Sequence, residues 1–473
     1  MNILFVTAEA SPFASSGGLG DVMGALPRAI SERGHTVDVV MPLYDTVNTD
    51  IRAKMSRLCD LTFNLSWRRT GAAVYALDEG NLRYLFIENH YYFDRGRLYG
   101  EHDDGERFAF FSRAVIELLL YMDDTPDILH ANDWQAAAAV LYLKTAFRDS
   151  EKLKNIKTVY TVHNIEYQGQ LDPCMLGDVY GVDQQFRDCF TYGDCINLTA
   201  GAIYAADAVT TVSPRYAEEL EYDFFSFGLS EVIKANKHKL YGVINGIDYT
   251  CFSPEIGGDI PCPYSISDIK LGKASNKASL QWRLGLEASA DTPLISMVTR
   301  LTPGKGLDLV LNIIEELLEE KCQMVILGTG DLRYEEAFGS LSERYSNLVS
   351  LIKFDRVLAK QIYAASDIFL MPSKSEPCGL AQMISCSYGT VPVVRSVGGL
   401  YDSIIPYGME NANGFRFDNF NAHELLFTVK DALKLYSDEE KWDSLVCSAK
   451  STKFTWDKSA TEYLAIYKKI INR

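Results

Sequence analysis

Apolar and polar positions near the start of the chain define two kinds of segment. A run of apolar and β-branched residues at Ile3–Ala8 predicts a buried strand, and Asp21–Arg33 places its apolar residues on one helical face. Between them, Glu9–Gly20 contains the glycines and serines of a loop. Gly34 then ends the helix, and Thr36–Met41 predicts the next strand. This order predicts a β-loop-α-β unit of a parallel sheet.

The same order of segments returns twice in the second half of the chain. Each copy joins a predicted strand to a predicted helix through a loop that contains glycine and proline. The copies are Leu294–Val298, Thr299–Gly306, Leu307–Glu320 and Met324–Leu327, and then Ile368–Pro372, Ser373–Gly379, a helix and Val391–Val394. We therefore predict an α/β protein with two Rossmann-like, doubly wound lobes that face each other across a cleft.

A change in composition marks the expected boundary between the lobes. Residues 251–275 are rich in proline, glycine and serine and lack a clear period. We expect an N-terminal lobe at residues 1–245 and a C-terminal lobe at residues 246–455. The last stretch, residues 456–473, has helical spacing and is expected to pack back on the N-terminal lobe.

Composition and charge narrow the classes of function. The 473 residues are 47% hydrophobic, enough for several buried cores. Lysine and arginine total 46 against 63 aspartate and glutamate, a net charge of −17, and basic clusters are missing, so neither nucleic acid nor a membrane is expected as a partner. No apolar run approaches the roughly 20 residues of a membrane helix, and Ala136–Leu143 is predicted to lie in a core helix.

The N-terminus and the cysteines indicate a location in the cell. No basic stretch precedes the first apolar residues, so a signal peptide or transit peptide is not expected. The ten cysteines include no Cys-x-x-Cys pair and no histidine at zinc spacing. We expect free, buried thiols, no metal site, and a cytoplasmic protein, or one of the plastid stroma if the source is a plant.

Loops of the first lobe contain candidate chemical groups, since ligands of doubly wound sheets bind beyond the carboxyl ends of the strands. The glycines of Ser15–Asp21 could let backbone N–H groups approach a phosphate, although turns also need glycine for its conformation alone. His130–Trp134 and Thr161–Asn164 follow two predicted strands. One histidine at a strand end more often makes a structural hydrogen bond, but two polar strand ends favour a shared site.

Loops of the second lobe add charged groups. Arg300 and Lys305 are close enough in sequence to reach one diphosphate, and the alternative is a solvated turn. Glu376 follows a strand and either points into the crevice or caps a helix dipole, and the Pro-Cys-Gly after it favours the crevice. Val397–Leu400 is a second glycine loop between a strand and a helix. Glycine loops in both lobes favour a ligand between them.

Several of these segments together resemble one enzyme family. The motifs are Gly17-Gly-Leu-Gly-Asp-Val22, Gly24-Ala-Leu-Pro27, Asp133-Trp134, Thr161-Val-His-Asn164, Asn245-Gly-Ile-Asp248, Arg300-Leu-Thr302, Lys305-Gly-Leu-Asp308, Glu376-Pro-Cys-Gly-Leu380 and Gly398-Gly-Leu400. The chain resembles bacterial and plant-type glycogen and starch synthases along its whole length. This resemblance implies a GT-B type, retaining glucosyltransferase that needs no metal or other cofactor. It implies ADP-glucose, with UDP-glucose as the alternative, as donor and an α-1,4-glucan as acceptor.

The resemblance also implies roles for residues at the family's motif positions. Arg300 and Lys305 match the pair that stabilises the departing diphosphate, and Glu376 and His163 match the other residues implied to be catalytic. The implied donor-binding residues are Ser15, Gly17, Gly18, Phe354, Cys378, Gly379, Gly398, Gly399 and Leu400, with Phe354 stacking on the base. The implied sugar and acceptor residues are Tyr99, Asp133, Asn164 and Asn245.

Two positions depart from the family pattern. The first glycine motif of the family normally begins with lysine, and this chain has Ser15; Val397 stands where the family usually has threonine. These two changes are the reason to consider an alternative function, that of a glucan-binding or regulatory homologue with weak turnover. A transferase of another sugar or a glucan phosphorylase would share the architecture, but no sequence context marks the Schiff-base lysine that a phosphorylase needs.

The serine at position 15 yields a prediction. We expect Ser15→Lys to lower the KM for the nucleotide-sugar donor, since a cation can make a charge-assisted contact worth about 1.5–3 kcal/mol that a hydroxyl cannot. Initial rates at a fixed primer concentration measure this KM. A KM that stays the same or rises would contradict the expectation.

Overall fold

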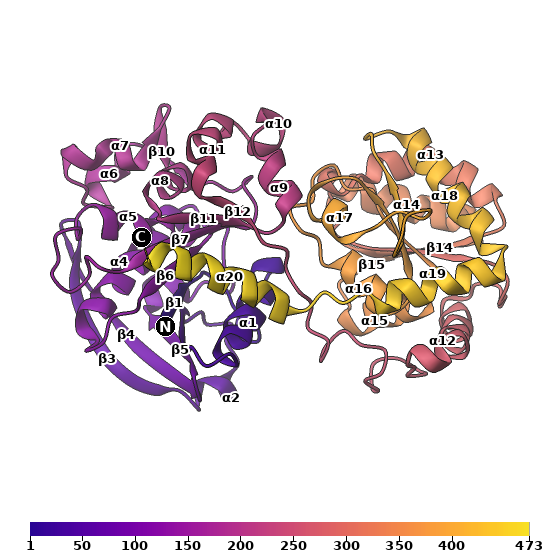
Figure 1. Cartoon of the computed structure of the whole chain (residues 1–473), viewed down its shortest axis with the longest axis horizontal. Coiled ribbons are helices and arrows are strands. Elements are labelled where there is room, and N and C mark those ends of the chain that lie inside the picture. The colour runs from indigo at the N-terminus through magenta and orange to yellow at the C-terminus, as the bar shows by residue number, and fades with distance from the viewer. Residues whose placement is uncertain (473) are drawn as a thin grey trace. The chain divides into compact units, whose positions relative to one another are not determined.

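The computed structural model describes residues 1–472, which form two units, each around its own sheet of mostly or wholly parallel strands (Figure 1). Unit 1 comprises Met1–Gly246 and the C-terminal stretch that starts at Trp456, and unit 2 comprises Ile247–Thr455. The chain thus leaves unit 1 once and returns to it for its last helix. Two doubly wound α/β units confirm the class of fold that the sequence pattern predicts.

Unit 1 contains a nine-stranded sheet in the order β12-β11-β7-β6-β1-β2-β5-β4-β3. Its strands are β1 (Asn2–Val6), β2 (Thr36–Pro42), β3 (Ser56–Leu65), β4 (Arg68–Glu79), β5 (Leu82–Glu88), β6 (Ile128–Asn132), β7 (Lys157–Val162), β11 (Ala208–Thr211) and β12 (Leu240–Gly242). Neighbouring strands are parallel except in the β3–β4 and β4–β5 pairs. Strand β1 pairs with β2 on one side and with β6 on the other. The loops after β1 and β6 therefore border a topological switch point, where such sheets bind ligands.

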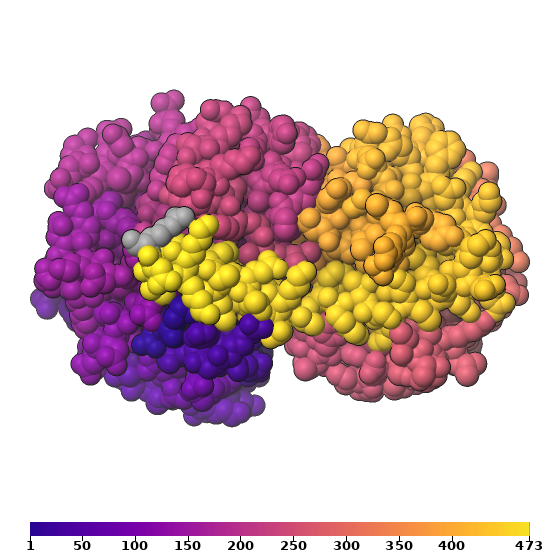
Figure 2. Space-filling view, viewed as in Figure 1, coloured from indigo at the N-terminus to yellow at the C-terminus, as the bar shows by residue number. Residues whose placement is uncertain are grey.

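Helices cover both faces of this sheet, because right-handed crossovers place the helices after β1 and β6 on opposite sides. The helices are α1 (Gly18–Ser31), α2 (Thr49–Arg52), α3 (His90–Phe93), α4 (Asp104–Tyr121), α5 (Trp134–Lys144), α6 (Met175–Asp178), α7 (Arg187–Phe190), α8 (Leu198–Ala205), α9 (Pro214–Glu219), α10 (Asp223–Ser226), α11 (Ser230–Asn236) and α20 (Trp456–Ile471). A small antiparallel sheet has the strands β8 (Gln170–Leu171), β10 (Cys195–Asn197) and β9 (Thr191–Tyr192). Figure 2 shows the yellow α20 lying against the indigo N-terminal segment, where it contacts α1.

Unit 2 contains a six-stranded, fully parallel sheet in the order β15-β14-β13-β16-β17-β18. Its strands are β13 (Leu294–Val298), β14 (Gln323–Gly328), β15 (Leu348–Ile352), β16 (Ile368–Met371), β17 (Val391–Arg395) and β18 (Phe415–Phe417). Its helices are α12 (Ile269–Leu284), α13 (Leu307–Glu319), α14 (Leu332–Arg344), α15 (Arg356–Ala365), α16 (Ala381–Ser387), α17 (Gly398–Ser403), α18 (Ala422–Tyr436) and α19 (Glu439–Ser451). The strand order reverses between β13 and β16, so the loops after these two strands border the switch point of unit 2.

The sequence expectations differ from the structure at element ends. Strand β1 stops at Val6 rather than Ala8, and α1 begins at Gly18 rather than Asp21. The earlier start follows from Leu19, which is buried and extends the apolar face of α1, while the first turn of a helix tolerates glycine because its N–H groups have no intrahelical partner. The glycine loop therefore partly belongs to the first turn of α1.

Cysteine exposure also differs from the expectation. All ten cysteines are free, as expected, but only Cys322, Cys378 and Cys386 are buried, and the others are exposed or half-buried. Between residues 1 and 472, no helix combines the length and the apolar character of a membrane span.

A buried histidine joins the last helix to the sheet of unit 1. His130, in β6, is fully buried and forms hydrogen bonds with the hydroxyl groups of Tyr467 in α20 (2.7 Å) and Thr161 in β7 (2.5 Å). Thr161 in turn bonds to Thr210 in β11 (2.5 Å). Burial lowers the pKa of His130 to about 3. Because His130 lies inside the packed unit with its ring nitrogens occupied, it has a structural role rather than a place among the exposed strand ends.

This burial predicts acid sensitivity. Below pH 6.5 the unfolded chain protonates His130 and the folded chain does not, so His130 lowers the free energy of unfolding by up to about 1.4 kcal/mol per pH unit as the pH falls from about 6.5 toward 3. We expect His130→Gln to be less stable at pH 7 and to have a shallower loss of stability between pH 6.5 and 5. Urea unfolding of both proteins across this range measures the slope, and parallel slopes would exclude the histidine as a cause.

Candidate active site

The loop after β1 in unit 1 is built around a buried carboxylate, Glu9. Glu9 is 3% exposed and accepts a hydrogen bond from the backbone N–H of Ser16 in the glycine loop. Burial raises the pKa of Glu9, an effect that the bond from Ser16 partly offsets. The hydroxyl of Tyr99 is buried beside this carboxylate without a hydrogen bond of good geometry, and burial, with the charge of Glu9 as a smaller cause, raises the pKa of Tyr99. The two side chains form one polar group under the glycine loop.

The glycine loop itself leaves open space above the start of α1. Gly17 and Gly18 are exposed, and a Cβ at either would meet no atom within 4 Å. Ser15 instead turns toward the helix: its hydroxyl donates to the carbonyl of Gly17 (3.4 Å), and a Cβ on Gly20 would lie 2.3 Å from its Oγ. Space for a ligand therefore exists over Gly17 and Gly18, while the side chain at position 15 fills a place over the first turn.

Asp133 links the ends of β6 and β7. Its backbone has a positive φ of 58°, which is uncommon for a residue other than glycine, and its carboxylate accepts a hydrogen bond from the N–H of His163 (2.7 Å). The carboxylate has no cation beside it, and burial raises the pKa of Asp133 to about 7. This backbone conformation is costly, and such strain is often retained at functional sites.

His163 is held as a neutral ring with one defined tautomer. The amide nitrogen of Asn132 donates to the carbonyls of Val6 and His130, which turns the amide oxygen toward Nε2 of His163 at 3.0 Å. Because that oxygen can only accept, Nε2 has the proton and Nδ1 is left as an acceptor. Burial lowers the pKa of His163 to about 3, so the ring is uncharged at neutral pH.

Two asparagines complete the candidate residues of unit 1. Asn164 follows His163 and accepts a hydrogen bond from the N–H of Glu166 (3.1 Å). Asn245 follows β12 and is 5% exposed, and its amide oxygen has no partner. An unpaired buried amide oxygen is unusual in a folded protein and indicates a place where a hydroxyl could donate.

An ion pair lies at the switch point of unit 2. Nζ of Lys305, in the loop after β13, is 2.6 Å from Oε2 of Glu376, in the loop after β16. The hydroxyl of Ser373 donates to the same oxygen (3.0 Å). Glu376 is 8% exposed, and Arg300, in the same loop as Lys305, is exposed and has no ion pair among the described residues. This edge of the sheet therefore presents one cation bound to a carboxylate and one free cation.

Backbone contacts bring these two loops together. Gly306 has a φ of +72°, and a Cβ there would lie 2.0 Å from the carbonyl oxygen of Pro372. The N–H of Lys374 donates to the carbonyl of Gly304 (2.9 Å). No side chain fits at position 306, so glycine lets Lys305 reach Glu376.

The second glycine motif differs from the first in its use of space. A Cβ on Gly398 would lie 2.0 Å from the carbonyl oxygen of Glu376, and one on Gly399 would lie 2.1 Å from that of Cys378. The N–H of Gly399 donates to the carbonyls of Glu376 and Pro377 (both 3.1 Å). These glycines are therefore required to pack α17 on the loop of Glu376, whatever else they bind.

The remaining candidate residues of unit 2 differ in exposure. Cys378 and Leu400 are buried, and Gly379 has a φ of +70° with its carbonyl bound by Gln382 (3.0 Å). Phe354 precedes α15 and is 80% exposed, with the guanidinium of Arg356 5.8 Å from its ring centre. An exposed ring at the end of a sheet strand is free to stack on a flat ligand.

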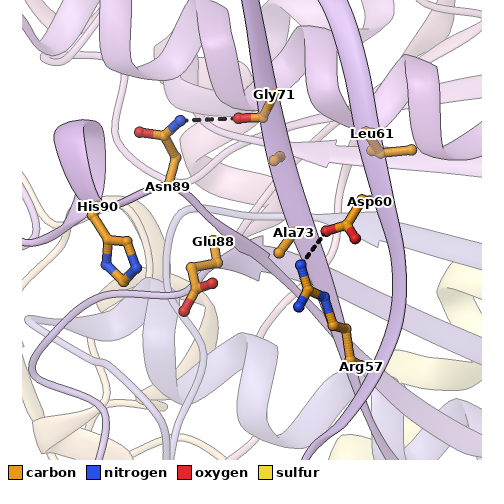
Figure 3. Close-up of a pocket in the computed structure, with 9 residues that line it drawn as sticks. Arg57, Asp60, Leu61, Gly71, Ala73, Glu88, Asn89 and His90 are labelled. Carbon is orange, nitrogen blue, oxygen red and sulfur yellow. Dashed lines mark hydrogen bonds and ion pairs between the residues drawn. The ribbon is translucent and has the colours of Figure 1, made fainter.

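A hollow of about 320 Å³ lies elsewhere in unit 1. Figure 3 shows its lining, which comes from β3, β4, the end of β5 and the start of α3 and includes Arg57, Asp60, Glu88 and His90. None of the candidate residues lines this hollow. The candidate residues of each unit instead lie in and near the loops at that unit's own switch point.

One cluster of possible metal ligands lies near Tyr99. Glu101, His102 and Asp103 offer ligand atoms within 4.8 Å of one another. Glu101 and Asp103 already pair with Arg97 (2.6 Å) and Arg95 (3.0 Å). Their charges are compensated by these arginines, and the cluster gives no reason to assign a metal site.

Two residues with clear contacts to the site were missed by the sequence reasoning. Glu9 supports the glycine loop, and Ser373 binds Glu376. Glu9 could have been suspected as an acid directly after a buried strand, as Glu376 was. Nothing in the sequence sets Ser373 apart from neighbouring serines.

Two mostly parallel sheets of Rossmann type, each with polar loops at its switch point, are the architecture of the GT-B class of glycosyltransferases, to which the comparisons assign this chain. Residues 2–235 match the family model of the starch synthase catalytic domain, and residues 281–445 match that of the glycosyl transferases group 1. The chain is 44% identical to the glycogen synthase of Alkaliphilus metalliredigens over 99% of its length and all of the relative, and 41% identical to that of Clostridium novyi over the whole of both.

Solved structures agree with these matches. The catalytic domain of starch synthase IV from Arabidopsis thaliana, bound to ADP and acarbose, is 34% identical with a TM-score of 0.91, covering 100% of this chain and 99% of that one. Sucrose-phosphate synthase from Thermosynechococcus elongatus shares the fold. It is 16% identical with a TM-score of 0.64, covering 100% of this chain and 99% of that one.

The chain belongs to the glycogen synthase family. Its activity is that of a glycogen or starch synthase, which transfers sugar from a nucleotide-sugar donor to a glucan acceptor.

The contact at Gly306 leads to a prediction. We expect Gly306→Ala to lower the free energy of unfolding by about 2–4 kcal/mol, because the new Cβ meets the Pro372 carbonyl and the positive φ disfavours alanine. Gly304→Ala is the matched control, since a Cβ there meets nothing within 4 Å. Chemical denaturation of both variants compares them, and equal midpoints would contradict the close approach.

Proposed function

We propose that this enzyme transfers glucose from ADP-glucose to the non-reducing end of an α-1,4-glucan, with retention at the anomeric carbon and without a metal ion. The Lys305–Glu376 ion pair beside the unpaired Arg300 is the observation that supports this most directly. Cleavage of the sugar–phosphate bond sends negative charge onto the nucleoside diphosphate. Fixed cations at that place stabilise the charge as it develops.

In this proposal, unit 2 binds the donor and each side chain has a distinct part. Arg300 contacts the diphosphate as a planar fork, and Lys305 contacts it as a point charge whose position Glu376 fixes. Glu376 accepts a hydrogen bond from a sugar hydroxyl, and Phe354 stacks on the base. Cys378, Gly379, Gly398, Gly399 and Leu400 form the wall next to the donor.

Unit 1 takes the sugar and acceptor side of the reaction. Its candidate groups are acceptors without a partner cation: Asp133, the neutral His163 and the unpaired oxygen of Asn245. Such groups suit the neutral, donor-rich hydroxyls of a glucan better than a phosphate. In the proposal Tyr99 and Asn164 complete this side, and Gly17 and Gly18 let a ligand approach the start of α1.

The choice of ADP-glucose over UDP-glucose rests on likeness to relatives. The starch synthase IV structure that this chain resembles was bound to ADP and acarbose. A cytoplasmic location remains a prediction from the cysteines and the composition.

Initial rates of nucleotide release test the proposed function. We expect release from ADP-glucose to exceed that from UDP-glucose by at least about tenfold and to require glycogen primer. Glu376→Ala should lower the rate by at least about a hundredfold, since it removes a polar contact to the reacting sugar, with an unchanged circular dichroism spectrum.

Three other results would each contradict part of the proposed function. Faster release from UDP-glucose would correct the donor. Glycogen binding with no release from either donor would indicate a regulatory glucan-binding protein, and full activity of Glu376→Ala would refute the role of that residue.

A further inference from the structure

The two carboxylate oxygens of Glu376 are used unequally. Oε2 accepts hydrogen bonds from Nζ of Lys305 (2.6 Å) and from the hydroxyl of Ser373 (3.0 Å). Oε1 makes no hydrogen bond within residues 1–472, and Glu376 as a whole is 8% exposed. One oxygen is thus fixed by the protein, and the other is available as an acceptor for a substrate hydroxyl.

Ser373 is dedicated to this carboxylate. It lies two residues after the end of β16, is fully buried, and within residues 1–472 its hydroxyl makes no hydrogen bond other than the one to Glu376. A buried hydroxyl is costly without a partner, so the bond constrains both residues.

The backbone of Ser373 is itself held in place. The guanidinium of Arg395, at the end of β17, donates to the carbonyls of Ser373 (3.5 Å) and Lys374 (2.7 Å). The N–H of Lys374 binds Gly304, one residue before Lys305. Ser373 therefore presents its hydroxyl from a loop that is bound on two sides, and this loop also adjoins the segment that contains Lys305.

Geometry explains why two donors act differently from one. A lysine ammonium is a compact charge on a flexible stem and leaves a carboxylate free to rotate around the single contact. A second donor from a fixed backbone position removes that rotation and sets the plane of the carboxylate. Orientation of a reacting group within a fraction of an ångström strongly affects rate.

We propose that Ser373 is a positioning residue for glucosyl transfer. By binding Oε2 of Glu376 together with Lys305, Ser373 keeps Oε1 directed at the donor sugar. This inference rests on the proposed function, which gives Glu376 and Lys305 their parts. A local role, in which Ser373 only closes the turn Ser373–Glu376, is the alternative that the test must separate.

Steady-state kinetics of Ser373→Ala provide the first test. We expect kcat to fall about tenfold while the KM for the nucleotide-sugar donor changes less than threefold, because the variant leaves the donor contacts in place but frees the carboxylate. Ser366→Ala is the matched control: Ser366 is also fully buried in unit 2, and its hydroxyl donates to the carbonyl of Ile362 (2.7 Å), away from Glu376. It should lose a similar amount of stability and keep its kcat within twofold.

A double-mutant cycle provides the second test and does not depend on how well the alanine variant folds. In a Glu376→Ala background, measured at raised enzyme concentration, adding Ser373→Ala should lower the residual rate less than twofold, since no side-chain oxygen is left for Ser373 to orient. An equal loss in both backgrounds, or a loss matched by Ser366→Ala, would overturn the proposal.

The wild-type rate in the same assay separates the two levels of inference. Normal turnover of the wild type with an unchanged kcat in Ser373→Ala overturns the positioning role alone. No turnover of the wild type with either ADP-glucose or UDP-glucose overturns the proposed function, and the role of Ser373 falls with it.

Discussion

Close contact between backbones is the constraint on which the charged edge of unit 2 depends. Lys305 and Glu376 are 71 positions apart in the sequence and meet because the loops after β13 and β16 touch without side chains between them. Gly306 faces the Pro372 carbonyl, and Gly398 and Gly399 face the backbone of Glu376 and Cys378. Glycine is the residue that permits such contact, and a β-carbon at any of these places would push the loops apart. The Lys305–Glu376 ion pair thus depends on glycines that let the two loops approach each other.

The candidate groups of the two units differ in charge. Unit 2 presents Arg300 and Lys305, whereas the candidate groups of unit 1 are carboxyls, amides and a neutral imidazole. Glu9 is buried and Asp133 is half-buried, neither forms an ion pair within residues 1–472, and burial raises the pKa of each. A net charge of −17 over the whole chain is compatible with local positive charge, because Arg300 and Lys305 lie together in the loop after β13.

The sequence predicts the architecture better than it predicts contacts. Alternating apolar runs and amphipathic segments identify β13, α13 and β17 nearly to the residue, because burial on a parallel sheet requires those patterns. The start of α1 was placed three residues late, since glycines suggest a loop even where a helix begins. The sequence motif alone cannot distinguish the open glycines at 17 and 18 from the packed ones at 398 and 399. The sequence does not predict the role of Ser373, because that role depends on which oxygen of Glu376 the hydroxyl binds. It places His130 at a polar strand end beside the candidate residues, because its structural partner Tyr467 lies 337 positions away.

The return of α20 to unit 1 has a consequence for the order in which the protein can fold during synthesis. All of unit 2 emerges from the ribosome before the last helix, so that unit can close its own sheet while the chain is still growing. Unit 1 must wait: the face beside α1 stays uncovered, and His130 has no partner at its Nδ1, until Tyr467 has been added. The first sheet to be made is therefore the last to be finished, and its apolar face beside α1 stays exposed to water in the interval.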